Sequence, residues 1–307
     1  MSKFQRTFKM EVQGRSGRTY TITDPLTVVL DINRRAYGSL NTATFMVYNL
    51  AQETRSDIQY DNAIDAEPRP FRFNAGYQSE GYQPLVFYGD LQRALSYREG
   101  PNVVTEIQVL DGGIAAQYVQ VERTRNYPWK PEAELRSLVD LMKPHGVTLG
   151  SLGSIAAGMT ATRGVTWIGS VWDVLRKIAA AQGGYACIDH GKVYLMAQND
   201  ALVIPGALPQ LDASTGLIDT PRRSGWVVDA QMIFETRVQL LQELKVVSSV
   251  NANINGTYCV QSISHRGIIS GARDGGVITA LSLQTLPESM NLINPYNNAS
   301  LGGTVTA

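Results

Sequence analysis

The residues that could do chemistry in this chain are few and scattered. Its three histidines, His145, His190 and His265, lie far apart, and no thiols or carboxylates accompany them at the spacing of zinc ligands. Only His190 follows an acid, Asp189, as an acid–histidine pair would require. Gly191 comes next and alternating residues flank the segment, a pattern typical of a hairpin turn. We therefore interpret this segment as a turn and expect neither a metal site nor a catalytic histidine.

Nucleophiles and cofactor-binding loops are also missing from the sequence. The run Gly150-Ser-Leu-Gly-Ser154 is not a nucleophile elbow, because its second glycine comes one residue too early. No phosphate-binding loop or dinucleotide fingerprint is present. Cys187 and Cys259 lie in separate regions and are expected to be buried free thiols. The sequence therefore predicts no catalytic residue and no cofactor.

Two pairs of adjacent arginines remain as candidate contact residues. Arg34 and Arg35 form the first pair, and Arg222 and Arg223 form the second. We place both pairs in loops, where they are either solvated charges or subunit contacts, since arginine is favoured at interfaces. His265 ends an alternating strand, and we assign it a role at the strand end or at an interface.

The composition favours a globular protein and excludes a strongly basic nucleic-acid binder. Hydrophobic residues make up 44% of the 307 residues and charged residues 18%, which argues against disorder. Lysine plus arginine equals aspartate plus glutamate, at 27 each, so no basic footprint for nonspecific or sequence-specific nucleic-acid binding exists. No apolar run resembles a signal peptide or a membrane span, so we expect the chain to be folded in a cytoplasm.

Residues 1–115 are predicted to form a β domain with one short helix. In Asn41–Leu50, Phe45 points to one side with its apolar neighbours, whereas Tyr48 points to the other, which indicates a sheet buried on one face. About eight short strands follow one another between turn signals. We expect them to close into an antiparallel barrel, because closure removes exposed edges.

Residues 116–200 follow a different pattern, typical of a small α+β domain. One helix is predicted over Glu132–Met142, where apolar residues recur at helical spacing, and another begins at Ser170. A β-hairpin over Tyr185–Met196 follows the second helix.

Residues 201–286 return to alternating strands and are predicted to form a second β-barrel. Residues 287–307 are rich in asparagine and glycine without periodicity, and we expect an extended arm. The predicted fold class is thus α+β, mainly β, with two antiparallel β-barrel domains separated by a small α+β domain.

This order of domains resembles a family of phage proteins. The motifs of the first β domain are similar to the N-terminal barrel of baseplate hub proteins of contractile-tailed bacteriophages, the tail hub family with two tandem β-barrel tube domains that includes late control protein D. A "glycine, tyrosine, valine, histidine" strand at residues 256–265 resembles the second barrel. The matching segments are Asn41–Leu50, Glu53-Thr-Arg55, Ala75-Gly-Tyr77, Val86-Phe-Tyr-Gly89, Leu110-Asp111-Gly112 and Gly256-Thr-Tyr258 with Val260 and Ser264-His265.

The resemblance implies a structural function. Hubs of this family are homotrimers in which two similar barrels per chain give a ring with pseudo-sixfold symmetry. Such a ring joins the hexameric tail tube to the trimeric central spike, contacts neighbouring baseplate proteins and lines the DNA channel. The chain would then reside in the virion tail baseplate after assembly in the host cytoplasm, with Tyr48 among its contact residues.

Two alternatives stay open at this stage. The chain could be a tail-associated glycosidase that uses Asp90 and Glu106 across one sheet, if their carboxyl groups lie about 5–9 Å apart. It could also be a carbohydrate-binding or small-molecule-binding module built on one barrel. Because the 307 residues are accounted for by the predicted domains, we expect any wall-degrading activity to belong to another protein.

Overall fold

The computed structural model describes residues 5–63, 68–81, 83–155, 159–271 and 275–286, so the expected arm at 287–307 lies outside the described residues. The fold is mainly β with short helices, and the predicted fold class is confirmed at this level. Among the described residues, no helix is both long and apolar enough to cross a membrane.

The first part of the chain is a run of antiparallel strands with a short helix after the fourth. Its elements are β1 (Arg6–Gln13), β2 (Thr19–Thr23), β3 (Val28–Arg35), β4 (Thr42–Tyr48), α1 (Gln52–Ile58), β5 (Tyr60–Asp61), β6 (Pro70–Tyr77), β7 (Leu85–Glu99) and β8 (Asn102–Leu110). The predicted strand at Asn41–Leu50 and the helix after it are therefore confirmed.

The middle part packs short helices against small sheets, as predicted. Its elements are α2 (Gly113–Tyr118), β9 (Gln120–Arg125), α3 (Pro131–Asp140), β10 (Thr148–Ser151), β11 (Val165–Ser170), α4 (Val171–Ala181), β12 (Gly184–Asp189) and β13 (Lys192–Ala197). Leu135 and Leu138 of α3 and Leu175 and Ile178 of α4 share one core with residues of β12 and β13. The helical spacing of these leucines in the sequence thus identified their buried face.

The last part returns to strands. Its elements are β14 (Gln210–Leu211), β15 (Arg222–Ser224), β16 (Val227–Ile233), β17 (Glu243–Val246), β18 (Gly256–Ile269) and β19 (Val277–Thr285). The long strand β18 changes its neighbour along its length. Residues 256–259 pair with β17, whereas residues 262–269 pair with β3, and an irregularity between Val260 and Ser262 separates the two halves.

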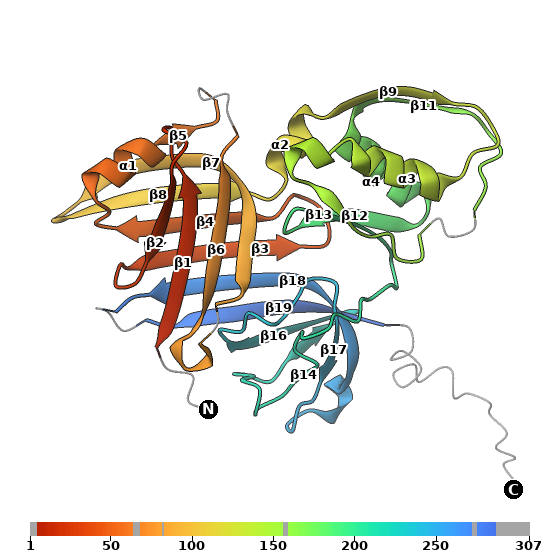
Figure 1. Cartoon of the computed structure of the whole chain (residues 1–307). Coiled ribbons are helices and arrows are strands. Elements are labelled where there is room, and N and C mark those ends of the chain that lie inside the picture. Colours follow the sequence, from red (N-terminus) through yellow and green to blue (C-terminus); the bar gives the residue numbers. More distant parts are fainter. Residues whose placement is uncertain (1–4, 64–67, 82, 156–158, 272–274, 287–307) are drawn as a thin grey trace, which may run out of the picture.

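The pairing of β18 with β3 joins the first and last parts into one sheet (Figure 1). The sheet has fourteen strands among the described residues, and its main path runs β15-β16-β19-β18-β3-β4-β8-β7-β6-β1-β2. It is open, so the prediction of two closed barrels was wrong. The physical reason is that β3 of the first part pairs with β18 of the last part, so neither part closes on itself, and β2 and β15 remain at the two ends of the main path.

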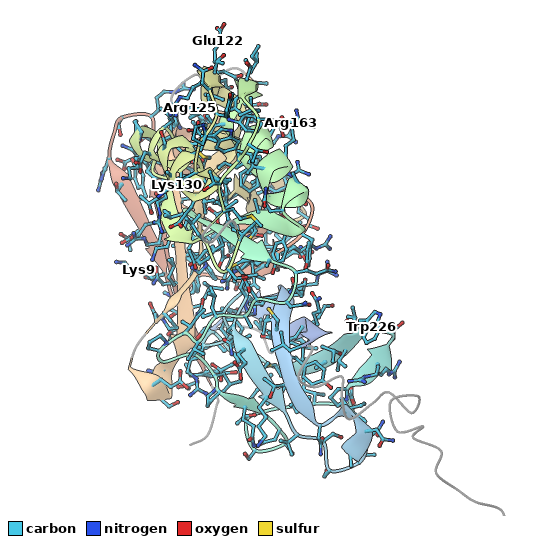
Figure 2. All side chains as sticks on the ribbon, turned by 90° about the vertical axis from the view of Figure 1, so that its right-hand side faces the viewer. Lys9, Glu122, Arg125, Lys130, Arg163 and Trp226 are labelled. Carbon is cyan, nitrogen blue, oxygen red and sulfur yellow. The ribbon has the colours of Figure 1, made fainter. Side chains whose placement is uncertain are left out.

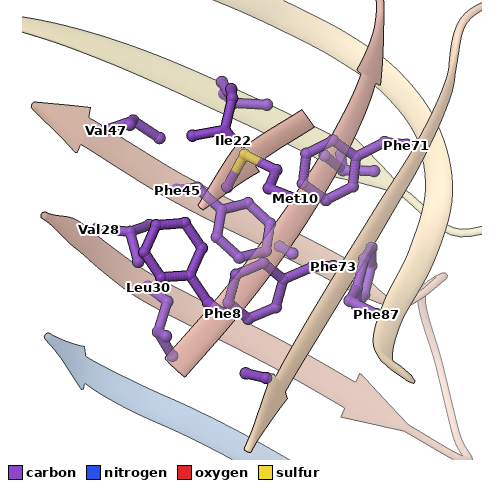
Figure 3. Close-up of a cluster of buried hydrophobic side chains, with 14 of the residues drawn as sticks. Phe8, Met10, Ile22, Val28, Leu30, Phe45, Val47, Phe71, Phe73 and Phe87 are labelled. Atoms are coloured by element: carbon purple, nitrogen blue, oxygen red, sulfur yellow. The ribbon is translucent and has the colours of Figure 1, made fainter. Parts of the chain in front are cut away.

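The sheet bends over itself, so that β1, β2 and β6 cover one side of β3 and β4 (Figure 1). The core between them is aromatic: the Phe45 ring lies 4.6 Å from the Phe73 ring and 5.1 Å from the Phe71 ring, centroid to centroid (Figure 3). Phe234 and Ile269 of the last part are buried in the same core. The first part therefore completes its core only with residues that lie some 200 positions further along the chain.

We predict that Phe45→Ala destabilises the chain by about 3–5 kcal/mol, because it leaves a cavity among packed rings. Urea denaturation followed by near-ultraviolet circular dichroism measures this change. Thr44→Ala, on the opposite face of the same strand, is the matched control and should lose less than about 1 kcal/mol. Equal losses for the two variants would contradict the assigned strand orientation.

Candidate functional site

The expected contact residues lie in strands rather than in loops, which corrects their predicted location. Arg34 and Arg35 end β3, and Arg222 and Arg223 begin β15. Because side chains alternate along a strand, each pair splits between the two faces of the sheet. Arg35 and Arg222 are exposed, whereas Arg223 is half-buried and donates a hydrogen bond to the Tyr258 hydroxyl over 2.8 Å.

Arg34 is an internal residue, only 1% exposed, so its expected role as a loop charge or subunit contact was wrong. It points to the same side of β3 as Leu30 and Ile32 and forms a bidentate ion pair with Asp189, at 2.9 Å from Nε and 2.7 Å from Nη2. The Asn41 side-chain amide donates to the same carboxylate over 2.9 Å and to the Ile188 carbonyl over 2.9 Å. Residues of the first and middle parts thus share one buried polar cluster.

A second buried acid, Asp111, lies beside this pair. Its carboxylate accepts hydrogen bonds from the backbone N–H groups of His190 and Gly191, over 2.5 and 2.9 Å. Burial and the nearby Asp189 charge raise the pKa of Asp111 well above its usual value. Burial also acts to raise the pKa of Asp189, but the Arg34 guanidinium outweighs burial and lowers it. The segment Asp189–Gly191 is thus the turn that we predicted, and it serves as the anchor of the middle part on β3 and β8.

The two buried histidines are structural. The His265 ring is 0% exposed, lies edge-on to Phe234 at 5.5 Å and has Nδ1 2.9 Å from the Thr279 hydroxyl. Its expected role at an interface was therefore wrong. Burial lowers the pKa of His265 to about 3 and that of His190, whose Nε2 lies 3.1 Å from the Val86 carbonyl oxygen, to about 4.

On the opposite side of the shared sheet, no helix or strand of the described residues packs over the strands. We call this side the open face; it comprises the outward-pointing side chains of β15, β16, β19, β18, β3, β4, β8 and β7. Tyr48 lies on the open face, and the register places Tyr48 of β4 and Tyr97 of β7 in one row, on either side of the buried Val104 of β8. Tyr97 is 43% exposed, so this row offers an aromatic surface near the β7–β8 hairpin.

A second exposed apolar group lies at the β15–β16 end of the open face. Trp226 is 64% exposed and Val227 is 38% exposed, and Figure 2 shows Trp226 at the surface of the last part of the chain. Exposed tryptophan is favoured at protein interfaces. The two apolar groups occupy different ends of the same sheet.

The two acids of the alternative enzyme reading do not form a pair. Asp90 lies opposite Leu110, and Glu106 is four residues away from Leu110 on β8, which separates the two acids by about 14 Å along the strands. Paired glycosidase carboxylates lie within about 10 Å. Asp90 instead accepts a hydrogen bond from the Ile114 N–H over 3.1 Å, and Glu106 accepts one from Gln108 over 2.6 Å. The proposed two-acid arrangement was therefore wrong.

No metal centre is formed by the residues that the structure describes: they contain no group of three histidine, cysteine or acidic side chains that could hold an ion. Cys187 and Cys259 are buried free thiols, as predicted, and burial raises the pKa of both. The features with functional potential are therefore the buried cluster and the open face.

Sequence reasoning missed Asn41, Asp111 and Asp189 as members of one cluster. A signal for Arg34 was present, because the alternation of β3 places it on the side of Val28, Leu30 and Ile32. A charge on a buried face needs a partner, and the sequence could have raised that question. It could not have identified Asp189 as the partner, 155 positions away.

A comparison with protein-family models gives one assignment over most of the chain. The model described as "Baseplate hub gp41" matches residues 4–267. A comparison with curated protein sequences gives no match.

Solved structures share the fold at low sequence identity. The 43 kDa tail protein of prophage MuSo2 from Shewanella oneidensis has a TM-score of 0.59 and 10% identity, covering 92% of this chain and 99% of its own. The tail protein from Neisseria meningitidis MC58 also has a TM-score of 0.59 and 10% identity, and the match covers 91% of this chain and 96% of that protein. The Escherichia coli c3393 protein, a component of the type VI secretion system, has a TM-score of 0.55 and 10% identity, and the match covers 86% of this chain and 75% of that protein.

We predict that Arg34→Met and Asp189→Asn each destabilise the chain by about 3–5 kcal/mol, because each leaves its buried partner uncompensated. The double variant should lose less stability than the two single variants lose in sum. A double-mutant cycle measured by urea denaturation should give a coupling energy of about 1–3 kcal/mol between the two side chains. Glu132→Gln, in the exposed pair with Arg136, is the control and should lose less than about 1 kcal/mol. Strict additivity at Arg34 and Asp189 would contradict the direct coupling.

We also predict that stability falls as the pH drops from about 6.5 to 4. The unfolded chain takes up protons on His190 and His265 in this range, whereas the folded chain holds both neutral, with pKa values of about 4 and 3. The contribution of the two neutral histidines to the free energy of unfolding is therefore fully present above the pKa of histidine in the unfolded chain. Below that pKa the free energy of unfolding falls by roughly 1.4 kcal/mol per pH unit for each histidine.

Denaturation midpoints at several pH values test this dependence. Between pH 6.5 and 4, His265→Asn should reduce the slope of the free energy of unfolding against pH. The reduction should be about half of the slope that the two buried histidines produce together. The exposed His145 provides the control, since His145→Asn should leave the slope unchanged. A slope that His265→Asn does not alter would rule out the buried neutral imidazole as its origin.

Proposed function

The chain belongs to the baseplate hub gp41 family, and we propose on that premise that it is the structural hub of a contractile phage tail. In this function three copies form a ring that joins the hexameric tail tube to the trimeric central spike and lines the DNA channel. The ring also contacts neighbouring baseplate proteins. The chain is assembled in the host cytoplasm and resides in the tail baseplate of the virion.

The open face is the observation that carries this proposal. It contains four strands of the last part, β15, β16, β19 and β18, followed by four strands of the first part, β3, β4, β8 and β7. Three chains would then contribute six four-stranded segments, the number that a ring needs to match a hexameric tube. The fold shared with two tail proteins, and with c3393, whose description compares it with the T4 tail proteins gp27 and gp5, supports the same function.

A structural function needs no chemistry, and this agrees with the geometry of the acids. Asp90 and Glu106 are too far apart for a glycosidase pair, and each is engaged by a local hydrogen bond. The matched family is named for a baseplate component. We therefore propose that the chain is not an enzyme and that wall degradation belongs to another protein.

Contacts between subunits are proposed at the two apolar ends of the open face. A cyclic ring requires two different surfaces of one chain to meet, because its interfaces are heterologous. Tyr48 and Tyr97 lie at one end and Trp226 with Val227 at the other. Arg35, Arg222 and Arg223 remain candidate contact residues beside these surfaces.

The oligomeric state of the purified chain tests the proposal. We expect native mass spectrometry to give a particle of three times the 33.6 kDa chain mass, and electron microscopy of the assembled tail to place it between tube and spike. A chain that stays monomeric both alone and with its tail-tube protein, or density elsewhere in the particle, would refute the hub function.

Tyr48→Glu should leave the fold intact and abolish the trimer. Tyr48 is only partly buried and faces away from the core, whereas a buried charge at an interface is strongly unfavourable. Circular dichroism and native mass measure the two properties on the same sample. Ala180→Glu, exposed on α4 of the middle part, is the matched control and should still form trimers. Trimers formed equally well by both variants would exclude Tyr48 from the contact.

A further inference from the structure

The centre of the open face is rich in small polar side chains, with Ile278 and Met46 as apolar neighbours on the same strands. Strands β3, β4, β18 and β19 present the polar side chains in neighbouring rows, and each of these side chains is at least partly exposed within the described part of the chain. A shallow polar hollow of about 450 Å³ extends this surface towards β15 and β16. The side chains that define the centre are Asn33, Thr42, Thr44, Ser262, Ser264 and Ser282.

This composition distinguishes the centre from the two ends of the face. The cores of protein interfaces are rich in aromatic residues, methionine and arginine and depleted in serine and aspartate. The aromatic rows at Tyr48 and Trp226 fit that description, whereas the serine-rich centre does not. The centre therefore suits a surface that stays in contact with water when the ends are buried against other subunits.

One arginine of this surface, Arg266, is paired with an acid. Asp31 accepts hydrogen bonds from Arg266 over 3.1 Å and from Asn33 over 2.6 Å. The Ser264 hydroxyl donates to the side-chain amide oxygen Oδ1 of Asn33 over 3.1 Å, so side chains of β3 and β18 are linked across the face. These contacts keep the Arg266 guanidinium directed along the surface towards an acid.

An acid and an arginine are also neighbours on the strands of the last part. Asp229 accepts a hydrogen bond from Ser282 over 2.6 Å, and the register places Arg222 opposite Asp229 on β15. Arg35 adds one further cation at the end of β3. Two acids thus accompany the three arginines that β15, β18 and β3 present to the open face.

We propose, on the basis of the proposed ring, that the open face is the wall along which double-stranded DNA passes, and that Asp31 and Asp229 prevent the wall from binding it. Unpaired arginines attract phosphates because counterions are released when they bind. An arginine already paired with a carboxylate offers much less of this attraction. A neutral, hydrated wall lets the duplex move without being held.

The width of the face is compatible with such a passage. Eight strands about 4.8 Å apart span about 38 Å, so three copies give a circumference of about 115 Å and a backbone diameter of about 37 Å. A layer of side chains about 5 Å thick on each wall, half of the spacing between packed sheets, leaves roughly 27 Å of open diameter. This opening admits a hydrated duplex.

The double variant Asp31→Asn with Asp229→Asn tests the role of the acids. Both side chains are at the surface and keep their size, so the fold should not change. Fluorescence anisotropy with a short labelled DNA duplex, on the purified assembly, should show at least tenfold tighter binding for the variant than for the native chain at 50 mM salt. The difference should disappear by 200 mM salt, because phosphate contacts are salt-dependent.

Asp173→Asn is the matched control, because Asp173 pairs with Arg176 on the exposed surface of α4, away from the open face. It should bind DNA no better than the native chain does. Tight binding by the native chain, equal binding by the control and the double variant, or unchanged binding by the double variant would each overturn the proposal.

The DNA-binding test of the wall and the oligomeric-state test of the hub function can fail independently. If the chain forms trimers and the double variant does not bind DNA, the hub function stands and the assignment of the wall fails. If the chain is monomeric, the hub function fails and with it the wall. In tails that carry the double variant, we expect normal assembly with slower DNA delivery, and assembly failure would instead mark the open face as a protein contact.

Discussion

The ladder between β3 and β18 is the interaction on which the rest of the structure depends. It pairs Val28–Arg35 with Ser262–Ile269 and so joins strands separated by more than 200 residues. Without it the first part would lack Phe234 and Ile269 in its core, and the open face would be two separate sheets. The price of such long-range pairing is a large loop-closure entropy, which only the packing of both parts together can offset.

The buried cluster around Arg34 fixes how the middle part sits at the end of this ladder. Burying an ion pair contributes little net stability, because desolvation offsets the attraction between the charges. Its geometry, however, is specific: a bidentate pair with Asp189, with Asn41 donating to the same carboxylate and Asp111 accepting from the adjacent turn. We therefore interpret the cluster as a determinant of orientation. Hydrophobic contacts supply the stability, and the cluster selects one arrangement of the three parts.

The chain carries its function on surfaces rather than in a pocket. The first and last parts each give four strands to one continuous face, and the aromatic groups lie at its ends while serine, threonine and asparagine occupy its centre. In a ring of such chains, apolar ends would be buried between neighbours and the polar centre would remain hydrated. The proposed assembly and DNA passage would depend on shape and charge balance and would need no catalytic group.

The sequence by itself determined the local elements and the class of protein. Alternation placed Phe45 inside and Tyr48 outside, helical spacing located α3 and α4, and the glycine after His190 marked a turn. Short motifs pointed to the hub family. These signals are local, because periodicity and turn chemistry depend on neighbouring residues.

Only the tertiary structure decided which edges pair and which charges are buried. The sequence of β18 is equally compatible with a closed second barrel, and its pairing with β3 depends on two edges being brought together by the whole fold. Arg34 and Arg35 are adjacent and chemically identical, yet one is buried against Asp189 and the other is exposed. Their difference comes from a partner 155 residues away, which no local pattern contains.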